Sequence, residues 1–107
     1  MNAKNLDWKK CSGFVPTIVQ EAETGKVLML AYSNKGSLEK ALETGQGWYY
    51  SRSRKRLWRK GEESGNTQGI VCIKADCDAD TLLFVVKQKG NACHLGKKSC
   101  FFGEVKE

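Results

Sequence analysis

Residues 76–80 read D-C-D-A-D and place three carboxylates and one thiol within five positions. If the segment is an extended strand, Asp76, Asp78 and Asp80 share one face, while Cys77 and Ala79 point to the other. Like charges on one strand face repel each other, and a bound divalent cation cancels that repulsion. Carboxylate oxygens suit magnesium, so the pattern indicates a magnesium site. A solvated acidic corner at the start of a strand is the alternative interpretation.

Two further cysteines, Cys93 and Cys100, flank the segment H-L-G-K-K-S, and Cys77 lies sixteen positions before Cys93. This spacing differs from the paired C-x-x-C arrangement of a structural zinc site. Three thiolates leave one position of a zinc ion open for water, which zinc activates near neutral pH. Inert buried cysteines are the alternative. His94, the one histidine of the chain, follows Cys93 directly and is the candidate for proton transfer, or else a packed or exposed bystander.

The segment 51–66, S-R-S-R-K-R-L-W-R-K-G-E-E-S-G-N, combines four arginines, two lysines, three serines and a tryptophan. Arginine forks match phosphate oxygens, serine hydroxyls add donors, and tryptophan can stack on a base. As a strand, the segment would place Arg52, Arg54 and Arg56 on one face. We predict a phosphate-binding segment here, with a solvated basic strand edge as the alternative. The candidate substrate-binding residues are Arg52, Arg54, Trp58, Lys60, Ser64, Gly65 and Asn66.

Length and charge limit the classes of protein. The 107 residues suffice for one domain, 1–107, with one hydrophobic core, and the net charge of +6 favours a polyanionic partner. The sequence has no apolar run of the ~20 residues that a membrane span needs, and its first residues lack the apolar stretch of a signal peptide. We therefore expect a cytoplasmic protein with no membrane partner and no disulfide framework. Cys11 and Cys72 belong to no cluster, and Cys72 is predicted to pack in the core.

Periodicity and turn signals predict the elements that must position these residues. Runs rich in Val, Ile, Leu and aromatic residues predict strands at 15–22, 27–32, 48–53, 68–75 and 81–88. A helix is expected over 35–44, capped by Asn34 and ended by Gly45, and 60–67 is predicted to be a loop. The expected fold class is α+β, a single compact domain with a mostly antiparallel sheet and one or two helices.

Taken in order, S-R-S-R-K-R-L-W-R-K-G-E-E-S-G-N-T-Q, D-C-D-A-D and A-C-H-L-G-K-K-S-C-F resemble the phosphoribosyl-AMP cyclohydrolases of histidine biosynthesis. The resemblance runs from about Val15 to Phe102. It implies hydrolysis of the N1–C6 bond of the purine ring in 1-(5-phosphoribosyl)-AMP, which yields a formimino-imidazole carboxamide ribonucleotide. It also implies a homodimer with one zinc and one magnesium per subunit, and a small phosphorylated nucleotide, not nucleic acid, as the partner.

The resemblance also assigns residues. The implied metal ligands are Cys77, Cys93 and Cys100 for zinc, and Asp76, Asp78 and Asp80 for magnesium. Cys77 would come from one subunit and the other two cysteines from its partner. The hypothesis that follows is that a zinc-activated water adds to C6 of the purine, as in zinc deaminases, with His94 moving the proton.

Two positions depart from the family pattern. Leu95 stands where threonine is frequent, and Glu63 turns the usual G-E-T-S-G into G-E-E-S-G. Neither is an implied metal ligand, but Leu95 removes a hydroxyl beside the zinc segment, and Glu63 adds negative charge to the expected phosphate loop. The chain ends at Glu107, without the length for the pyrophosphohydrolase domain fused to this enzyme in some relatives, so a single activity is expected. The alternatives from other classes are a zinc-stabilised RNA-binding module, against which the three aspartates argue, and a structural zinc dimer without catalysis.

Overall fold

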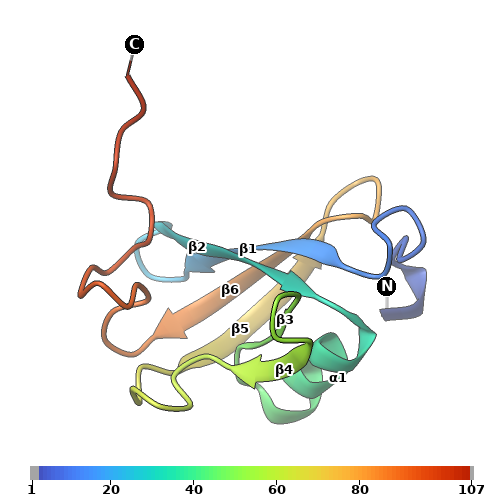
Figure 1. Ribbon diagram of the computed structural model, residues 1–107, viewed down its shortest axis with the longest axis horizontal. Helices are drawn as coiled ribbons and strands as arrows, with labels where there is room; N and C mark the ends of the chain where they lie inside the picture. Colours follow the sequence, from blue (N-terminus) through green and yellow to red (C-terminus); the bar gives the residue numbers. More distant parts are fainter. Residues whose placement is uncertain (1–2, 107) are drawn as a thin grey trace.

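The computed structural model describes residues 3–106 as one small α+β domain. Its main sheet has four strands in the order β2–β1–β6–β5 (Figure 1). These strands are β1 (Val15–Glu21), β2 (Val27–Ser33), β5 (Gln68–Ala75) and β6 (Leu82–Gln88). The strands β3 (Trp48–Ser51) and β4 (Arg56–Arg59) form a separate hairpin, accompanied by the helix α1 (Lys35–Thr44) and the short 3-10 helix η1 (Ala3–Asn5).

The pairing of the strands confirms the predicted fold class. Neighbouring strands along the chain pair antiparallel, β1 with β2 and β5 with β6, because a short turn can reverse the chain between them. The central pair, β1 with β6, is parallel and joins the two hairpins into one sheet. This parallel pair brings the first strand of the chain beside the last, although most of the sequence lies between them.

The helix α1 begins and ends where the sequence predicts. The Asn34 side chain accepts a hydrogen bond from the Ser37 backbone N–H at 2.8 Å, and the Ser37 hydroxyl accepts one from the Asn34 N–H at 2.9 Å. This reciprocal capping satisfies two backbone donors that a helix start otherwise leaves unpaired. At the other end, Gly45 adopts a left-handed φ of 71° and its N–H donates to Ala41, which closes the helix.

The hydrophobic core lies between one face of the main sheet and the layer formed by α1 and the β3–β4 hairpin. Val19, Leu28 and Phe84 present fully buried side chains from this sheet face. Tyr49 of β3 is also fully buried, and its ring lies 5.5 Å from the Phe84 ring and 5.2 Å from the Trp58 ring, between centroids. These contacts fix the small hairpin, and with it the basic segment, against the sheet.

The opposite face of the main sheet carries an apolar row across β2, β1 and β6, and no helix or hairpin of the described residues covers this row. Leu30, Ile18 and Leu83 stand directly opposite one another on β2, β1 and β6, so their side chains share this face. Leu30 is 47% exposed, and Ile18 and Leu83 are half-buried. An aligned apolar row that remains open on a small protein is typical of a contact surface.

Three local predictions are wrong. The strand expected over 48–53 ends at Ser51, because Ser51 pairs with Arg56 and residues 52–55 form the turn between β3 and β4. Arg52 and Arg54 therefore belong to a turn and do not share a strand face with Arg56. The segment 76–80 is also a turn, not a strand. Cys72 is half-buried at an irregularity of β5 and is not among the buried core residues.

Within residues 3–106, no helix has the length and apolarity that crossing a membrane requires.

Candidate metal and substrate sites

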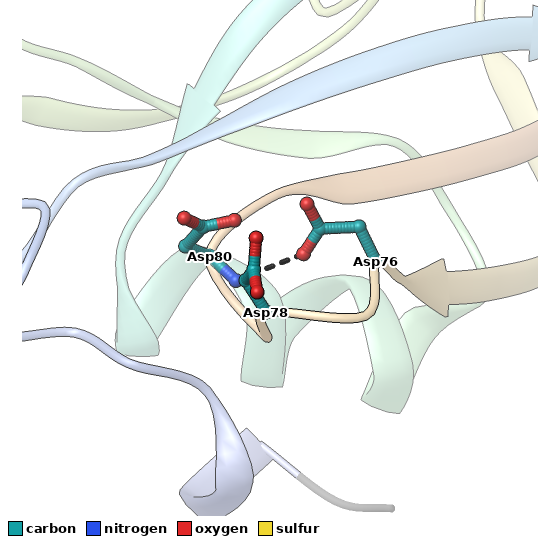
Figure 2. Close-up of side chains that lie close together, drawn as sticks. All are labelled: Asp76, Asp78 and Asp80. Atoms are coloured by element: carbon teal, nitrogen blue, oxygen red, sulfur yellow. Dashed lines mark hydrogen bonds between the residues drawn. The ribbon is translucent and has the colours of Figure 1, made fainter.

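The three aspartates gather on the loop between β5 and β6, with their carboxylates close together (Figure 2). One oxygen from each carboxylate lies within 4.8 Å of the others. The loop is tightened by the Asp80 N–H, which donates to the Asp76 carboxylate at 3.1 Å, and by Ala79, whose φ is 57°. The expected clustering is therefore present, but a tight turn produces it, not the alternation of a strand. Because carboxylates are hard ligands, the donor set fits magnesium.

A lysine from the N-terminal segment contacts this loop. Lys10 Nζ lies 2.6 Å from Asp80 Oδ2, and the hydrogen bond lowers the pKa of Asp80 and raises the pKa of Lys10. The Cys11 thiol donates to the Asp80 carbonyl oxygen at 3.6 Å. Sequence reasoning missed Lys10, since it lies seventy positions from its partner and no local pattern marks it. The ammonium offsets part of the repulsion among the carboxylates.

Two of the cysteines lie together on the cysteine strap, which we define as residues 91–100, after β6. Cys93 is 7% exposed, and the Cys100 N–H donates to the Leu28 carbonyl at 2.7 Å, which ties the end of the strap to β2. Burial raises the pKa of the Cys100 thiol, and the neighbouring Cys93 raises it further. Two adjacent thiols are soft donors, and they fit zinc better than magnesium.

The third cysteine of the expected zinc set is elsewhere on the chain. Cys77 is exposed on the aspartate loop before β6, while Cys93 and Cys100 follow β6. The seven residues of β6 separate the two ends by roughly 20 Å, at ~3.3 Å per residue. Figure 1 shows the β5–β6 loop and the strap at opposite ends of the sheet. Among the described residues, the aspartates are the one set of three metal-binding side chains within mutual reach, so a single chain does not assemble the three cysteines.

A basic groove with a volume of about 440 Å³ lies between the β3–β4 hairpin, the loop that follows it and the cysteine strap. Four basic side chains face two acidic ones, so the groove suits an anionic ligand. The strap contributes His94 to its edge. The groove is lined by Ser51, Arg54, Arg56, Trp58, Arg59, Lys60, Gly61, Glu62, Glu63, Ser64 and His94.

Internal ion pairing decides which cations of the groove face a ligand. Arg56 binds Glu62 with a 2.6 Å contact, and the Glu62 carboxylate also accepts the Arg59 backbone N–H at 3.3 Å. The hydrogen bond from Arg56 is the main reason that the pKa of Glu62 is lowered. Glu62 thus fixes the hairpin to the loop that follows it, and the Arg56 charge is largely neutralised locally.

The structure brings some predicted residues together and leaves others apart. Arg54, Trp58, Lys60 and Ser64 line the groove beside His94. Arg52 lies on the other side of the hairpin, where its guanidinium carbon is 3.6 Å from the centre of the Tyr32 ring. Gly65 and Asn66 belong to the same loop as Ser64 but do not line the groove. Six further residues line the groove and were not among the candidates from the sequence: Ser51, Arg56, Arg59, Gly61, Glu62 and Glu63. A hairpin with its turn at 52–55 would have placed them in the groove.

The two departures from the family pattern have different surroundings. The Leu95 side chain is 65% exposed, and its backbone N–H donates to the Cys93 sulfur at 3.5 Å. That contact needs only the backbone, so it is available to any residue other than proline at this position. Glu63 lines the basic groove, where it adds negative charge beside the expected phosphate contacts.

Fold and site together define a small α+β protein with a cationic groove beside a pair of thiols. A family model described as phosphoribosyl-AMP cyclohydrolase matches residues 29–102. A protein of that name from Listeria innocua is 60% identical over 95% of both chains. The protein of the same name from Nitrosopumilus maritimus is 54% identical over 95% of this chain and 94% of its own length. The one from Clostridium botulinum is 56% identical over 92% of this chain and 90% of its own length. The chain belongs to the phosphoribosyl-AMP cyclohydrolase family, which confirms the resemblance seen in its motifs.

Proposed function

We propose that this chain hydrolyses the N1–C6 bond of the purine ring in 1-(5-phosphoribosyl)-AMP, a step of histidine biosynthesis. Family membership supports the reaction, and one structural observation carries it: the basic groove meets His94 and the Cys93–Cys100 pair at one place. The substrate carries two phosphate groups and a purine. A groove that combines arginines, serines and a tryptophan matches each of these parts.

The groove residues would bind and orient the substrate. Arg54 and Ser64 are suited to a phosphate, because guanidinium and hydroxyl groups donate to its oxygens. Trp58 offers a ring face on which the purine can stack, and its position in β4 is fixed by contact with the buried Tyr49 ring. Glu63 also lines the groove, and its negative charge repels a phosphate close to it. The phosphates are therefore expected to lie nearer Arg54.

We propose that Cys93 and Cys100 of one subunit and Cys77 of its partner hold zinc. The adjacency of the first two, and the position of Cys77 at the far end of β6, support a site built from two chains. Zinc, when bound by three thiolates with one position open, supplies a Lewis acid that activates water near neutral pH. Binding in this way would make the dimer a condition of activity.

His94 is the proposed proton carrier of the reaction. It directly follows Cys93 and lines the groove, so its imidazole would lie between the thiol pair and a purine stacked on Trp58. Hydrolysis adds the oxygen of water to C6 and one of its hydrogens to N1 as the bond between them breaks, and the second hydrogen passes to the exocyclic nitrogen or, from a cationic purine, leaves as a proton. An imidazole can take the proton from the attacking water and deliver it to N1.

Magnesium on Asp76, Asp78 and Asp80 is the second proposed metal. Cys77 lies on the same loop, so a shared zinc site would also bring this acidic loop to the partner's groove. A magnesium ion held there would offset the negative charge of a substrate phosphate. The aspartates and the groove residues would then act on one substrate from two subunits.

The uncovered face of the main sheet is the proposed dimer surface. The aligned row of Ile18, Leu30 and Leu83 supplies apolar area, and the divided cysteine set requires a second copy of the chain. All five cysteines are free thiols, which is compatible with the proposed location in the reducing cytoplasm.

The reaction can be tested by following the ultraviolet spectrum of phosphoribosyl-AMP mixed with protein loaded with zinc and magnesium. Ring opening changes the purine absorption, so a protein with both metals that leaves the spectrum unchanged would remove the proposal. Cys93→Ser and His94→Ala separate catalysis from a structural zinc. We expect Cys93→Ser to lose zinc and His94→Ala to keep it, while both remain folded and lose turnover by a factor of about 100 or more.

The alternatives predict other results. A structural zinc dimer without catalysis would make Cys93→Ser unfold, and neither the wild type nor His94→Ala would open the purine ring. An RNA-binding module would give tight binding to single strands that weakens steeply with salt.

A further inference from the structure

Lys60 lies at the junction between the basic groove and the cysteine strap. It directly follows β4, and its backbone N–H donates to the Gly47 carbonyl at 2.9 Å, which fixes the position of its main chain. The side chain is half-buried and lines the groove beside Trp58. Its ammonium group does not end in the open groove, however. It donates a hydrogen bond to the carbonyl oxygen of Ala92, the residue directly before Cys93.

The peptide that Lys60 contacts is a fixed point of the strap. Ala92 is 1% exposed, and its N–H donates to the Lys98 carbonyl at 3.0 Å. The Cys93 N–H donates to the Lys97 carbonyl at 3.1 Å, so the strap folds back on itself between the two cysteines. The strap contains neither helix nor strand. Hydrogen bonds therefore hold its shape: those of Ser99 and Cys100 attach its end to β2, and the one from Lys60 attaches it to the hairpin just before Cys93.

The Lys60 ammonium thus ends at the peptide that leads into Cys93. The sequence singled out Lys60 as a phosphate contact, whereas the geometry directs its ammonium to the strap.

We infer that Lys60 is a positioning residue for the cysteine pair, holding the Ala92 peptide so that Cys93 and Cys100 are set to bind one zinc ion together. The inference rests on the proposed function, because it presumes that these two thiols bind zinc. Groups that hold metal ligands in place typically change metal affinity by ~10–100-fold when they are removed. A residue that only binds a substrate phosphate would change KM and leave zinc affinity as it was.

The test compares zinc affinities of folded protein by competition with a chromophoric chelator. Lys60→Met keeps the length of the side chain but removes the donor and the charge, and we expect zinc binding weaker by ~10-fold or more. Lys60→Arg keeps a charged donor, and its zinc affinity should stay within a few-fold of the wild type. Lys35→Met is the matched control, since it removes an exposed lysine from the start of α1 and should leave zinc binding unchanged.

The outcomes are separable. Wild-type protein that binds no zinc would overturn the zinc part of the proposed function and this inference with it. Wild-type protein that binds zinc, with Lys60→Met binding it equally well, would overturn the inference alone. A raised KM for Lys60→Met at unchanged zinc affinity would return Lys60 to the role of a phosphate contact. If Lys60→Met does not fold, Lys60→Ala gives the same comparison, because it also removes the donor and the charge, with circular dichroism as the check on folding.

Discussion

At the scale of single residues, Glu21 connects the main sheet to the cysteine strap. This side chain at the end of β1 is only 8% exposed, and its carboxylate binds Lys98 of the strap at 2.7 Å. Thr24 donates to the same carboxylate at 2.9 Å. The hydrogen bond from Lys98, followed by the one from Thr24, lowers the pKa of Glu21 below its ordinary value of 4.5. Glu21 therefore stabilises the folded state when it is ionised.

We expect Glu21→Gln to lower the free energy of unfolding by about 1 kcal/mol at neutral pH, since one charge-assisted pair is lost. Because the pKa of Glu21 is lower in the folded state, this stabilisation is complete at pH values above the pKa of Glu21 in the unfolded chain. It is lost as the pH falls through the pKa of Glu21 in the folded protein, which lies below 4.5. Urea unfolding of both proteins should therefore show a difference near neutral pH that shrinks in acid. Glu39→Gln, which removes an exposed acid from α1, is the control. If the difference in the free energy of unfolding between Glu21→Gln and wild type grew in acid, the prediction would be contradicted.

The sequence predicts side-chain clusters that are local in the chain, but not contacts between distant residues. The types and spacing of Asp76, Asp78 and Asp80 identified a cluster that the structure indeed forms. The contacts of Lys10 with Asp80 and of Lys60 with Ala92 were not predictable, because they join residues seventy and 32 positions apart. Such contacts depend on how the strands pair, and no local pattern encodes that.

Among the helices and strands, local sequence signals predict the bounds of α1 but neither the β3–β4 hairpin nor the pairing of β1 with β6. The bounds of α1 follow from Asn34 and Gly45, which act within one turn of the helix. The β3–β4 hairpin was missed, because a run of arginines and serines carries no alternation of apolar and polar residues. Lys55 has a φ of 53° in the turn, a conformation in which glycine or asparagine would have signalled the reversal. The parallel pairing of β1 with β6 is equally invisible to local signals.

The loop after β4 gives a prediction at this scale, because two of its glycines are conformationally alike but differ in their surroundings. Gly61 and Gly65 have φ angles of 84° and 81°. A Cβ atom on Gly61 would lie 2.5 Å from the Asn66 carbonyl carbon, whereas one on Gly65 meets nothing within 4 Å. We expect Gly65→Ala to lower the free energy of unfolding by about 1 kcal/mol, the cost of the left-handed conformation. Gly61→Ala should lose clearly more, because backbone must also move.

Denaturant unfolding of the two variants side by side measures the comparison. The shared strain of the left-handed conformation cancels between them, so the excess loss in Gly61→Ala reports the close approach of the two sides of the loop. Equal losses would mean that the loop widens without cost, and the wall of the groove would then be less fixed than its packing indicates.

At the scale of the whole molecule, the two halves of the proposed zinc site lie at opposite ends of β6. Cys77 precedes this strand, and Cys93 follows it. In a symmetric dimer, each contact is made twice, so two complete sites would form, each with Cys77 from one chain and Cys93 and Cys100 from the other. The open apolar face around Leu30 is the surface proposed for the contact between the two chains. Residue spacing alone does not divide the three cysteines; the family resemblance implies the division, and the length of β6 gives the physical reason that a single chain does not bring them together.

Mixing two inactive variants tests this arrangement directly. Cys77→Ser removes the cysteine that a chain contributes to the zinc site of its partner. Cys93→Ser removes a cysteine that a chain contributes to the site beside its own groove. Each homodimer therefore has no intact zinc site and should be inactive. A heterodimer of the two has one intact site and one that lacks both residues. Random exchange makes half of the dimers mixed, so ring-opening activity should return to about a quarter of the wild-type value. Zinc content measured on the same mixture should rise in parallel. A mixture that stays inactive, while an untagged variant co-purifies with an affinity-tagged one and so shows that the dimers have exchanged, would place all three cysteines of a site on one chain or remove the shared site altogether.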